Sequence, residues 1–113
     1  MNANQKLNKL TEDVVKVVKN VANEKVHKIY LYGSYARGDF DGESDIDIMV
    51  ILDCKKNDVQ SFRRRMCYYA SRLGLEYDIE VSILMRDKEN FYNNQDIMPF
   101  YQNIINEGIE IYG

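Results

Sequence analysis

The spacing of apolar residues along this 113-residue chain predicts alternating helices and strands. Near the start, apolar positions recur every three or four residues, and Lys, Glu, Asp and Asn fill the gaps, which is typical of an amphipathic helix. These positions are Leu7, Leu10, Val14, Val17, Val18 and Val21. The short apolar run Val26–Tyr32 then predicts a first strand.

A second strand and a second helix follow. Residues 45–53 alternate so that one face carries only apolar side chains and must be buried; these are Ile46, Ile48, Val50 and Leu52. We expect Asn57 or Asp58 to cap the next helix, and Gly74 to end it. Its buried stripe is Val59, Phe62, Met66, Tyr69 and Leu73.

The last third of the chain predicts one more strand, a short helix and a final helix. The strand is expected from about residue 75 to 84, and a short helix and loop over residues 87–94. Pro99 is expected to begin a helix that ends at Gly108. Residues 109–113 are apolar at alternate positions and are expected to pack on a sheet edge. The pattern predicts a single α/β domain, residues 1–113, with helices packed on a small mixed sheet in an αβαβαβα-like order.

Composition excludes several classes of protein. Apolar residues make up 45% and charged residues 29% of the chain, which is ordinary for a globular domain. The net charge of −3 argues against broad electrostatic binding of nucleic acid. No apolar run reaches the length of a membrane helix, and no secretion segment is visible at the start. Cys54 and Cys67 are too few for a disulfide framework, so a cytoplasmic location with reduced thiols is expected.

Three consecutive arginines, residues 63–65, lie within the second predicted helix. Consecutive residues fan around a helix, so the three side chains cannot form one tight patch. A solvated basic face is the favoured interpretation, and contact with nucleic acid or an acidic partner is the alternative.

The first candidate for chemistry is the Gly33–Ser34 pair, which directly follows the first predicted strand. Gly33 allows a sharp bend and the close approach of a ligand, and the Ser34 hydroxyl can donate to a phosphate oxygen. Residues 35–37 are expected to form a short helical turn with Ser34 as its N-cap, a place that favours anions. On its own, such a pair usually marks an ordinary turn.

Asp45 and Asp47 are the stronger signal. In a strand they share one face and lie about 6.6 Å apart, so both can reach one or two divalent cations. Oxygen ligands of this kind suit magnesium when nucleotide phosphates complete its coordination. A solvated acidic strand end is the alternative, but it suits one aspartate better than two, because unpaired carboxylates repel each other.

The spacing of these residues resembles a family signature. Gly33-Ser34, ten residues and then Asp45-Ile46-Asp47 resembles that of the DNA polymerase beta-like nucleotidyltransferase superfamily. The fuller string Gly-Ser-Tyr-Ala-Arg-Gly-Asp from residue 33, with Ser-Asp-Ile-Asp from residue 44, resembles the minimal nucleotidyltransferases. Some of those act as antitoxins (MNT) beside a HEPN-domain toxin.

The resemblance implies a metal site and its ligands. Two Mg²⁺ ions would be held by Asp45 and Asp47, with a third carboxylate on a neighbouring strand. Asp78 is preferred because the third acid of the superfamily is usually an aspartate. Glu80 is its rival, because both residues point the same way in the predicted strand.

The resemblance also implies a reaction, the transfer of a nucleoside monophosphate, AMP from ATP, to an acceptor hydroxyl. Gly33 and Ser34 would hold the β and γ phosphates. Arg37 would either neutralise the leaving pyrophosphate or form a surface ion pair with Asp39 or Asp41. The implied acceptor is a tyrosine of a HEPN toxin. Two alternatives stay open: a small-molecule nucleotidyltransferase that acts as a homo-oligomer, and an antitoxin that binds without catalysis.

Overall fold

The computed structural model describes residues 2–113 as an alternation of helices and strands that ends on a strand. In chain order these are α1 (Ala3–Ala22), a 3-10 turn (Asn23–Lys25), β1 (Val26–Tyr32), α2 (Ser34–Arg37), β2 (Ile46–Leu52), α3 (Lys56–Tyr77), β3 (Val81–Asp87), α4 (Lys88–Asn93), α5 (Pro99–Glu107) and β4 (Ile109–Tyr112). Most of these elements lie where the sequence predicts them.

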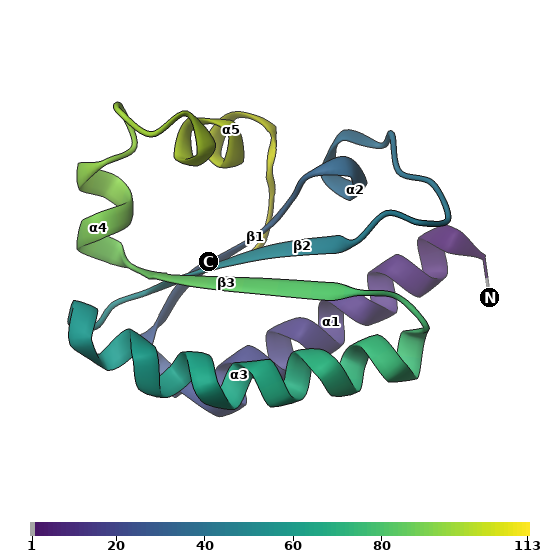
Figure 1. The fold of residues 1–113 in the computed structure, drawn as a ribbon, viewed down its shortest axis with the longest axis horizontal. Helices are drawn as coiled ribbons and strands as arrows, with labels where there is room; N and C mark the ends of the chain where they lie inside the picture. Colours follow the sequence, from purple (N-terminus) through teal and green to yellow (C-terminus); the bar gives the residue numbers. More distant parts are fainter. Residues whose placement is uncertain (1) are drawn as a thin grey trace.

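A four-stranded mixed sheet with the order β3-β2-β1-β4 forms the centre of the fold. β1 pairs antiparallel with both β2 and β4, whereas β2 and β3 are parallel. A parallel pair needs a long crossover, which α3 supplies. Figure 1 shows α1 and α3 on one side of the sheet and α4 and α5 on the other. The predicted α/β class with a small mixed sheet is therefore confirmed.

β2 is buried on both faces, which explains its nearly continuous apolar sequence. Its even-numbered residues from Ile46 to Leu52 pack in the core beneath α1 and α3. Met49 and Ile51 point the other way, into a second cluster with Phe91, Tyr101 and Ile104 of α4 and α5. The strand that carries the acidic pair is thus held from both sides.

The start of α1 and the end of the chain agree with the sequence. Asn2 and Gln5 form a capping box, in which each side chain accepts from the other residue's backbone N–H. α5 begins at Pro99 and ends before Gly108, and β4 then pairs with β1 at the sheet edge. The predictions for α5 and for the end of the chain are confirmed, whereas the capping box of α1 was not predicted.

The predicted bounds of α3 are wrong at both ends. Its N-cap is Lys55 rather than Asn57 or Asp58, and the helix continues past Gly74 to Tyr77. A β-carbon at Gly74 would lie 2.9 Å from the carbonyl oxygen of Ile79, so this glycine makes room for the returning chain inside the helix. The left-handed residue that ends α3 is Asp78, with φ of 53°.

The longer α3 shifts the third strand along the chain. Tyr77 is buried, and its hydroxyl donates to the Asp13 carboxylate of α1, which holds the last turn of α3 against α1. The third strand therefore begins at Val81 instead of about residue 75. β2 is also slightly shorter than expected, so Asp45 lies just before it.

Over residues 2–113, none of the helices has the length and apolar character needed to cross a bilayer. The long helices α1 and α3 instead bury one stripe and expose charged residues.

The buried face of β2 yields a stability prediction. Ile48 is fully buried between helices and sheet, so Ile48→Ala is expected to lower the free energy of unfolding by about 2–5 kcal/mol. Leu75 is 85% exposed on α3, and Leu75→Ala is the matched control, expected to change stability by less than about 0.5 kcal/mol. Urea denaturation measures both. Equal effects of the two substitutions would contradict the assigned core.

Candidate active site

The Gly33 turn and the acidic pair meet because β1 and β2 are antiparallel neighbours. The register places Tyr32, the last residue of β1, opposite Asp47 near the start of β2. Gly33 follows directly, so the turn folds back over the Asp47 carboxylate. The structure therefore brings together the two features that the sequence singled out.

Gly33 is required for both conformation and space. Its backbone angles, φ of 76° and ψ of −154°, are unfavourable for any residue that carries a β-carbon. A β-carbon at this position would overlap the Oδ2 atom of Asp47. The Gly33 carbonyl also accepts from the N–H groups of Ala36 and Arg37, which begins α2. Gly33 is thus the N-cap of α2, and Ser34 is its first residue, which corrects the prediction that Ser34 caps this turn.

Asp47 lies in an electrostatically unfavourable place. Burial and the nearby Asp45 carboxylate raise the pKa of Asp47, while the positive charge of Arg37 lowers it. Burial and the charge of Asp47 raise the pKa of the Tyr32 hydroxyl to about 12. A cation bound between the two carboxylates would relieve their repulsion.

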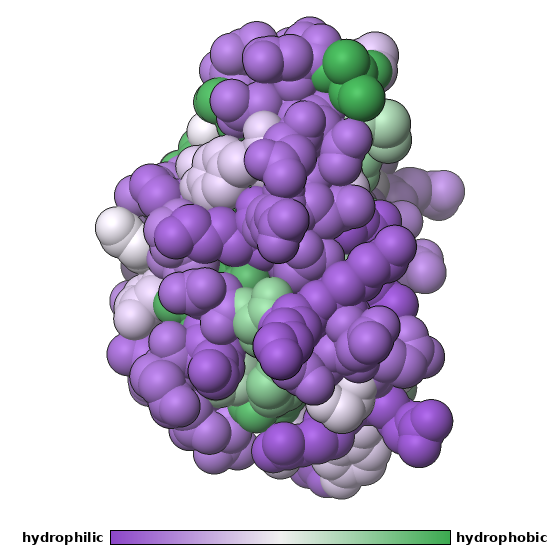
Figure 2. Space-filling model, turned by 90° about the vertical axis from the view of Figure 1, so that its left-hand side faces the viewer, coloured by the Kyte–Doolittle hydropathy of each residue, from purple (hydrophilic) through white to green (hydrophobic). Residues whose placement is uncertain are grey.

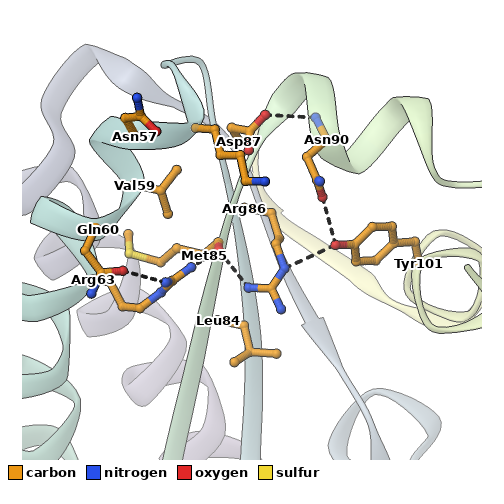
Figure 3. Close-up of a pocket in the computed structure, with 11 residues that line it drawn as sticks. Asn57, Val59, Gln60, Arg63, Leu84, Met85, Arg86, Asp87, Asn90 and Tyr101 are labelled. Carbon is orange, nitrogen blue, oxygen red and sulfur yellow. Dashed lines mark hydrogen bonds between the residues drawn. The ribbon is translucent and has the colours of Figure 1, made fainter.

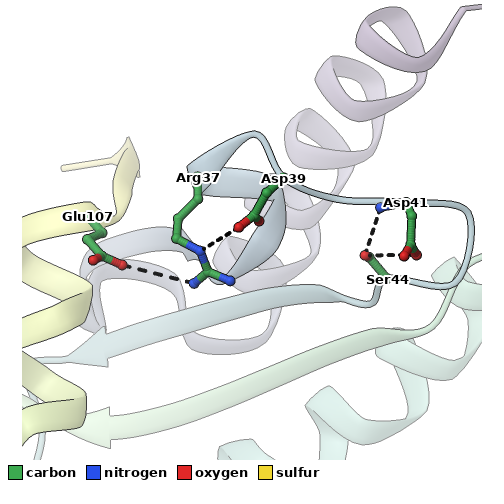
Figure 4. A network of polar contacts seen from close by, with 5 residues as sticks. All are labelled: Arg37, Asp39, Asp41, Ser44 and Glu107. Atoms are coloured by element: carbon green, nitrogen blue, oxygen red, sulfur yellow. Dashed lines mark hydrogen bonds and ion pairs between the residues drawn. The ribbon is translucent and has the colours of Figure 1, made fainter.

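Arg37 projects from α2 toward two other acidic groups. Its Nε donates to Asp39 at 3.2 Å, and its Nη1 lies 4.0 Å from Glu107 of α5 (Figure 4). Asp41 is engaged elsewhere, because its carboxylate accepts from the Glu43 N–H and the Ser44 hydroxyl. Of the two ion pairs expected for Arg37, with Asp39 or with Asp41, the structure therefore contains the pair with Asp39. Arg37 is exposed and remains free to turn toward a ligand beside Asp47.

Neither candidate for the third carboxylate lies inside a strand, which corrects the expected strand at residues 75–84. Asp78 caps α3 and lines a cavity of about 340 Å³ with Ile46 and residues of α1. Glu80 immediately precedes β3, and its carbonyl accepts from the Ile46 N–H. The parallel register pairs Ile46 with Val81, so Glu80 continues it opposite Asp45.

Asp78 lies toward the face of the sheet opposite to that of Asp47. Ile46 and Asp47 point to opposite faces of β2, and Asp78 shares its cavity with Ile46. Within the described residues, 2–113, no three Asp, Glu, His or Cys side chains are grouped to hold a metal ion. The site is thus a pair of carboxylates, with Glu80 at its edge.

Three residues near the pair were not predicted from the sequence. Tyr32 and Ser82 pair with Asp47 from the two neighbouring strands, and residues paired in this way point to the same face. Glu107 of α5 lies 4.0 Å from Arg37 and not against the two carboxylates themselves. The alternation along each strand indicates which residues share a face with Tyr32 or with Ser82. Only the register between the strands shows that both residues lie beside Asp47.

The comparison with protein families identifies the class. Residues 7–108 match the model of the nucleotidyltransferase domain, and the chain therefore belongs to this family of nucleotidyltransferase enzymes. Among its relatives is MJ0604 of Methanocaldococcus jannaschii, 31% identical over 104 residues, which cover 92% of this chain and 96% of that protein. MJ0141 of the same organism is 28% identical over 102 residues, 90% of this chain and 95% of the relative. Both are named as candidate protein adenylyltransferases.

Solved structures share the fold. A toxin–antitoxin structure with AMP-PNP matches with a TM-score of 0.61 and 21% identity, covering 91% of this chain and 73% of that one. A complex of the tri-AMPylated HEPN toxin of Shewanella oneidensis with MNT antitoxin matches with a TM-score of 0.55 and 20% identity, covering 92% and 70%. At these identities the similarity establishes the fold, and the predicted nucleotidyltransferase fold is confirmed.

The raised pKa of Asp47 predicts a pH-dependent effect on stability. The folded chain holds the proton of Asp47 more tightly than the unfolded chain, so its ionisation destabilises the fold as the pH rises above the ordinary value of 3.8. Asp47→Asn is therefore expected to unfold at a higher temperature than the wild type at pH 7. The difference should disappear as the pH falls to 3.8 and below.

Differential scanning fluorimetry across this pH range measures the effect. Asp53→Asn, at the exposed end just after β2, is the matched control and should show no such pH-dependent gain. A wild type more stable than Asp47→Asn at neutral pH would contradict the assigned electrostatics.

Proposed function

We propose that this nucleotidyltransferase moves AMP from ATP to a hydroxyl group of a protein partner, with Mg²⁺ as its metal. The observation that supports the proposal is the close approach of Gly33 to the Asp47 carboxylate, because a turn that held phosphates there would lie directly beside the proposed metal ligand. Family membership supports the chemistry. The metal, the acceptor and the residue roles are the proposed parts.

The residues present fit a magnesium site. Asp47 is half-buried beside Asp45, and its pKa is raised first by burial and then by the Asp45 charge, so a cation here would stabilise its ionised form. Two carboxylates together with phosphate oxygens and water form an oxygen ligand set that suits Mg²⁺. Asp45 and Asp47 would hold two such ions. When bound, the metal supplies charge neutralisation at the phosphates and acidity at the acceptor hydroxyl.

The Gly33 turn and α2 would hold the β and γ phosphates of ATP. Because Gly33 has no side chain, a phosphate oxygen can approach the backbone closely. The Ser34 hydroxyl would donate to the same group. Arg37 would turn from Asp39 toward the pyrophosphate and stabilise its negative charge as it leaves.

Glu80 is the better candidate for the third carboxylate. It continues the parallel register opposite Asp45, whereas Asp78 opens into the cavity beside α1. Glu80 would accept the proton of the acceptor hydroxyl or complete the metal site. This assignment replaces the sequence-based preference for Asp78 with a geometric one.

The surface beside the site fits a protein acceptor. Several large apolar side chains are exposed on the segment that includes α5, where Glu107 meets Arg37; they are Ile97, Met98, Phe100, Ile105 and Ile109. Exposed apolar groups that gather in one region mark interaction surfaces. The similar toxin–antitoxin structures make a HEPN-type toxin the proposed partner and its tyrosine the proposed acceptor.

A second candidate function rests on the same apolar surface. A second copy of this chain would also cover it, and a homo-oligomer would then hold a small-molecule acceptor between subunits. A third candidate is an antitoxin that binds its partner through this surface without catalysis, so that Asp45 and Asp47 take part in no reaction. The three functions differ in where the nucleotide is found after the reaction.

Labelled ATP distinguishes them. Incubation of the wild type with α-³²P-labelled ATP, Mg²⁺ and a HEPN-type partner is expected to label the partner on tyrosine. Asp45→Asn and Asp47→Asn are each expected to lower the rate about 100-fold or more, because each removes a charge from the metal site. Gel autoradiography and mass spectrometry measure the product.

Asp53→Asn is the control here as well, and its rate should remain close to that of the wild type. Label on an aminoglycoside instead of the partner would support the small-molecule function. A complex that forms without any label would support simple binding. Label on an aminoglycoside, or a complex without label, would contradict the proposed protein acceptor.

The third carboxylate is tested with a matched pair of variants. Glu80→Gln is expected to lower the transfer rate about tenfold or more, because the neutral amide cannot take up a proton. Asp78→Asn is expected to leave the rate nearly unchanged, because its side chain lies toward the other face of the sheet. Steady-state kinetics at saturating ATP decides between them, and loss of activity in Asp78→Asn alone would reverse the assignment.

A further inference from the structure

A second cavity lies along the free edge of the sheet, away from Asp47. β3 is an edge strand, and α3 and α4 flank it. Between them is an open pocket of about 730 Å³ (Figure 3). The surface on this side of the molecule is mostly hydrophilic, with a narrow hydrophobic strip near its middle (Figure 2). The pocket has the size of a small-molecule site.

Two arginines meet in this pocket on a single oxygen atom. Arg63 of α3 donates through Nη2 to the Met85 carbonyl at 3.2 Å, and Arg86 of β3 donates through Nη1 to the same oxygen at 2.8 Å. Because both bonds end on the Met85 oxygen, the Nη2 atom of Arg63 and the Nη1 atom of Arg86 are no farther apart than the sum of the two bond lengths. Figure 3 shows them converging from opposite sides.

Both arginines are held in place by neutral groups. The Nη1 of Arg63 donates to the Gln60 side chain at 2.9 Å, and the Nε of Arg86 donates to the Tyr101 hydroxyl at 3.1 Å. Each side chain therefore uses two of its five N–H groups. The remaining donors have no hydrogen-bond partner among residues 2–113.

The charged side chains that line the pocket are mostly positive. Among residues 2–113, no carboxylate lies within 4.0 Å of either guanidinium group. Asp87, the one acid among the described residues that line the pocket, is buried and accepts from the Asn90 N–H at 2.9 Å. Lys56 adds a third positive charge. Like charges at this separation repel, and a bound anion removes that repulsion.

We propose that this pocket binds the phosphate group of a small phosphorylated molecule of nucleotide size or smaller. Three cations and one anion leave an excess of two positive charges, which a phosphate dianion balances better than a single carboxylate. Arginine forks match phosphate oxygens in pairs. The apolar side chains of Val59 and Leu84 provide a surface for the rest of the ligand.

The proposed site is separate from the acidic pair and does not depend on the transfer reaction. Arg86 pairs with Ile51, which is four residues along β2 from Asp47. Four residues of strand span about 13 Å. The Arg63–Arg86 pair is therefore offset along the strands from the nucleotide proposed at Gly33, while the charge of Arg86 still reaches the Tyr32 hydroxyl and lowers its pKa.

Nuclear magnetic resonance of the ¹⁵N-labelled chain tests the proposal. Without metal and with EDTA present, inorganic pyrophosphate is titrated into the wild type, and citrate into a second sample. We expect pyrophosphate to cause saturable shifts of the amide signals of residues 57–63 and 84–90. The Arg63→Gln/Arg86→Gln double variant is expected to weaken this binding at least tenfold, and Asp45→Asn to leave it unchanged.

Arg65→Gln is the matched control, because Arg65 is exposed on α3 and does not line the pocket; its affinity should stay within twofold of the wild type. Three outcomes would overturn the proposal: no saturable shifts in the wild type, shifts confined to residues 33–38, or full binding by the double variant. Tighter binding of citrate than of pyrophosphate would overturn the phosphate assignment. If the double variant does not fold, Arg63→Gln alone carries the test with the same expected loss.

Discussion

The contact between the Gly33 turn and the Asp47 carboxylate is the constraint on which the candidate site depends. It arises from the pairing of β1 with β2, which places Tyr32 opposite Asp47 and the turn immediately above it. Only a residue without a β-carbon fits there. The acidic residue and the bend are thus placed by backbone pairing, which is more rigid than a side-chain contact between two loops.

The buried core compensates for the unfavourable free energy of the half-buried Asp47 charge. Asp47 shares β2 with residues that are buried on both faces of the sheet. Burial of apolar surface stabilises the strand, while the half-buried charge near its start opposes folding. A carboxylate held in this way cannot move away from its neighbour Asp45. Functional sites commonly carry local destabilisation of this kind, which the surrounding structure must outweigh.

Much of the fold could be predicted because each element has a clear period or end signal. The stripe of α1, the strand Val26–Tyr32 and the helix Pro99–Glu107 all agree with the structure. The end of α3 could not be predicted, because Gly74 is the usual signal of a helix end, and here it serves to make room for Ile79. That error also misplaced Asp78 and Glu80. Their relation to Asp45 depends on strand register, which a single strand's pattern does not contain.

The arginine pair on Met85 has a consequence for how the chain behaves among other molecules. An outer strand with bare carbonyl oxygens is a template on which a foreign strand can grow. At β3 the Met85 oxygen already accepts two bonds from charged side chains, and bringing in another backbone would require their displacement. At Met85 the open edge of the sheet is therefore blocked to a further strand, and removing both guanidinium groups would free this carbonyl.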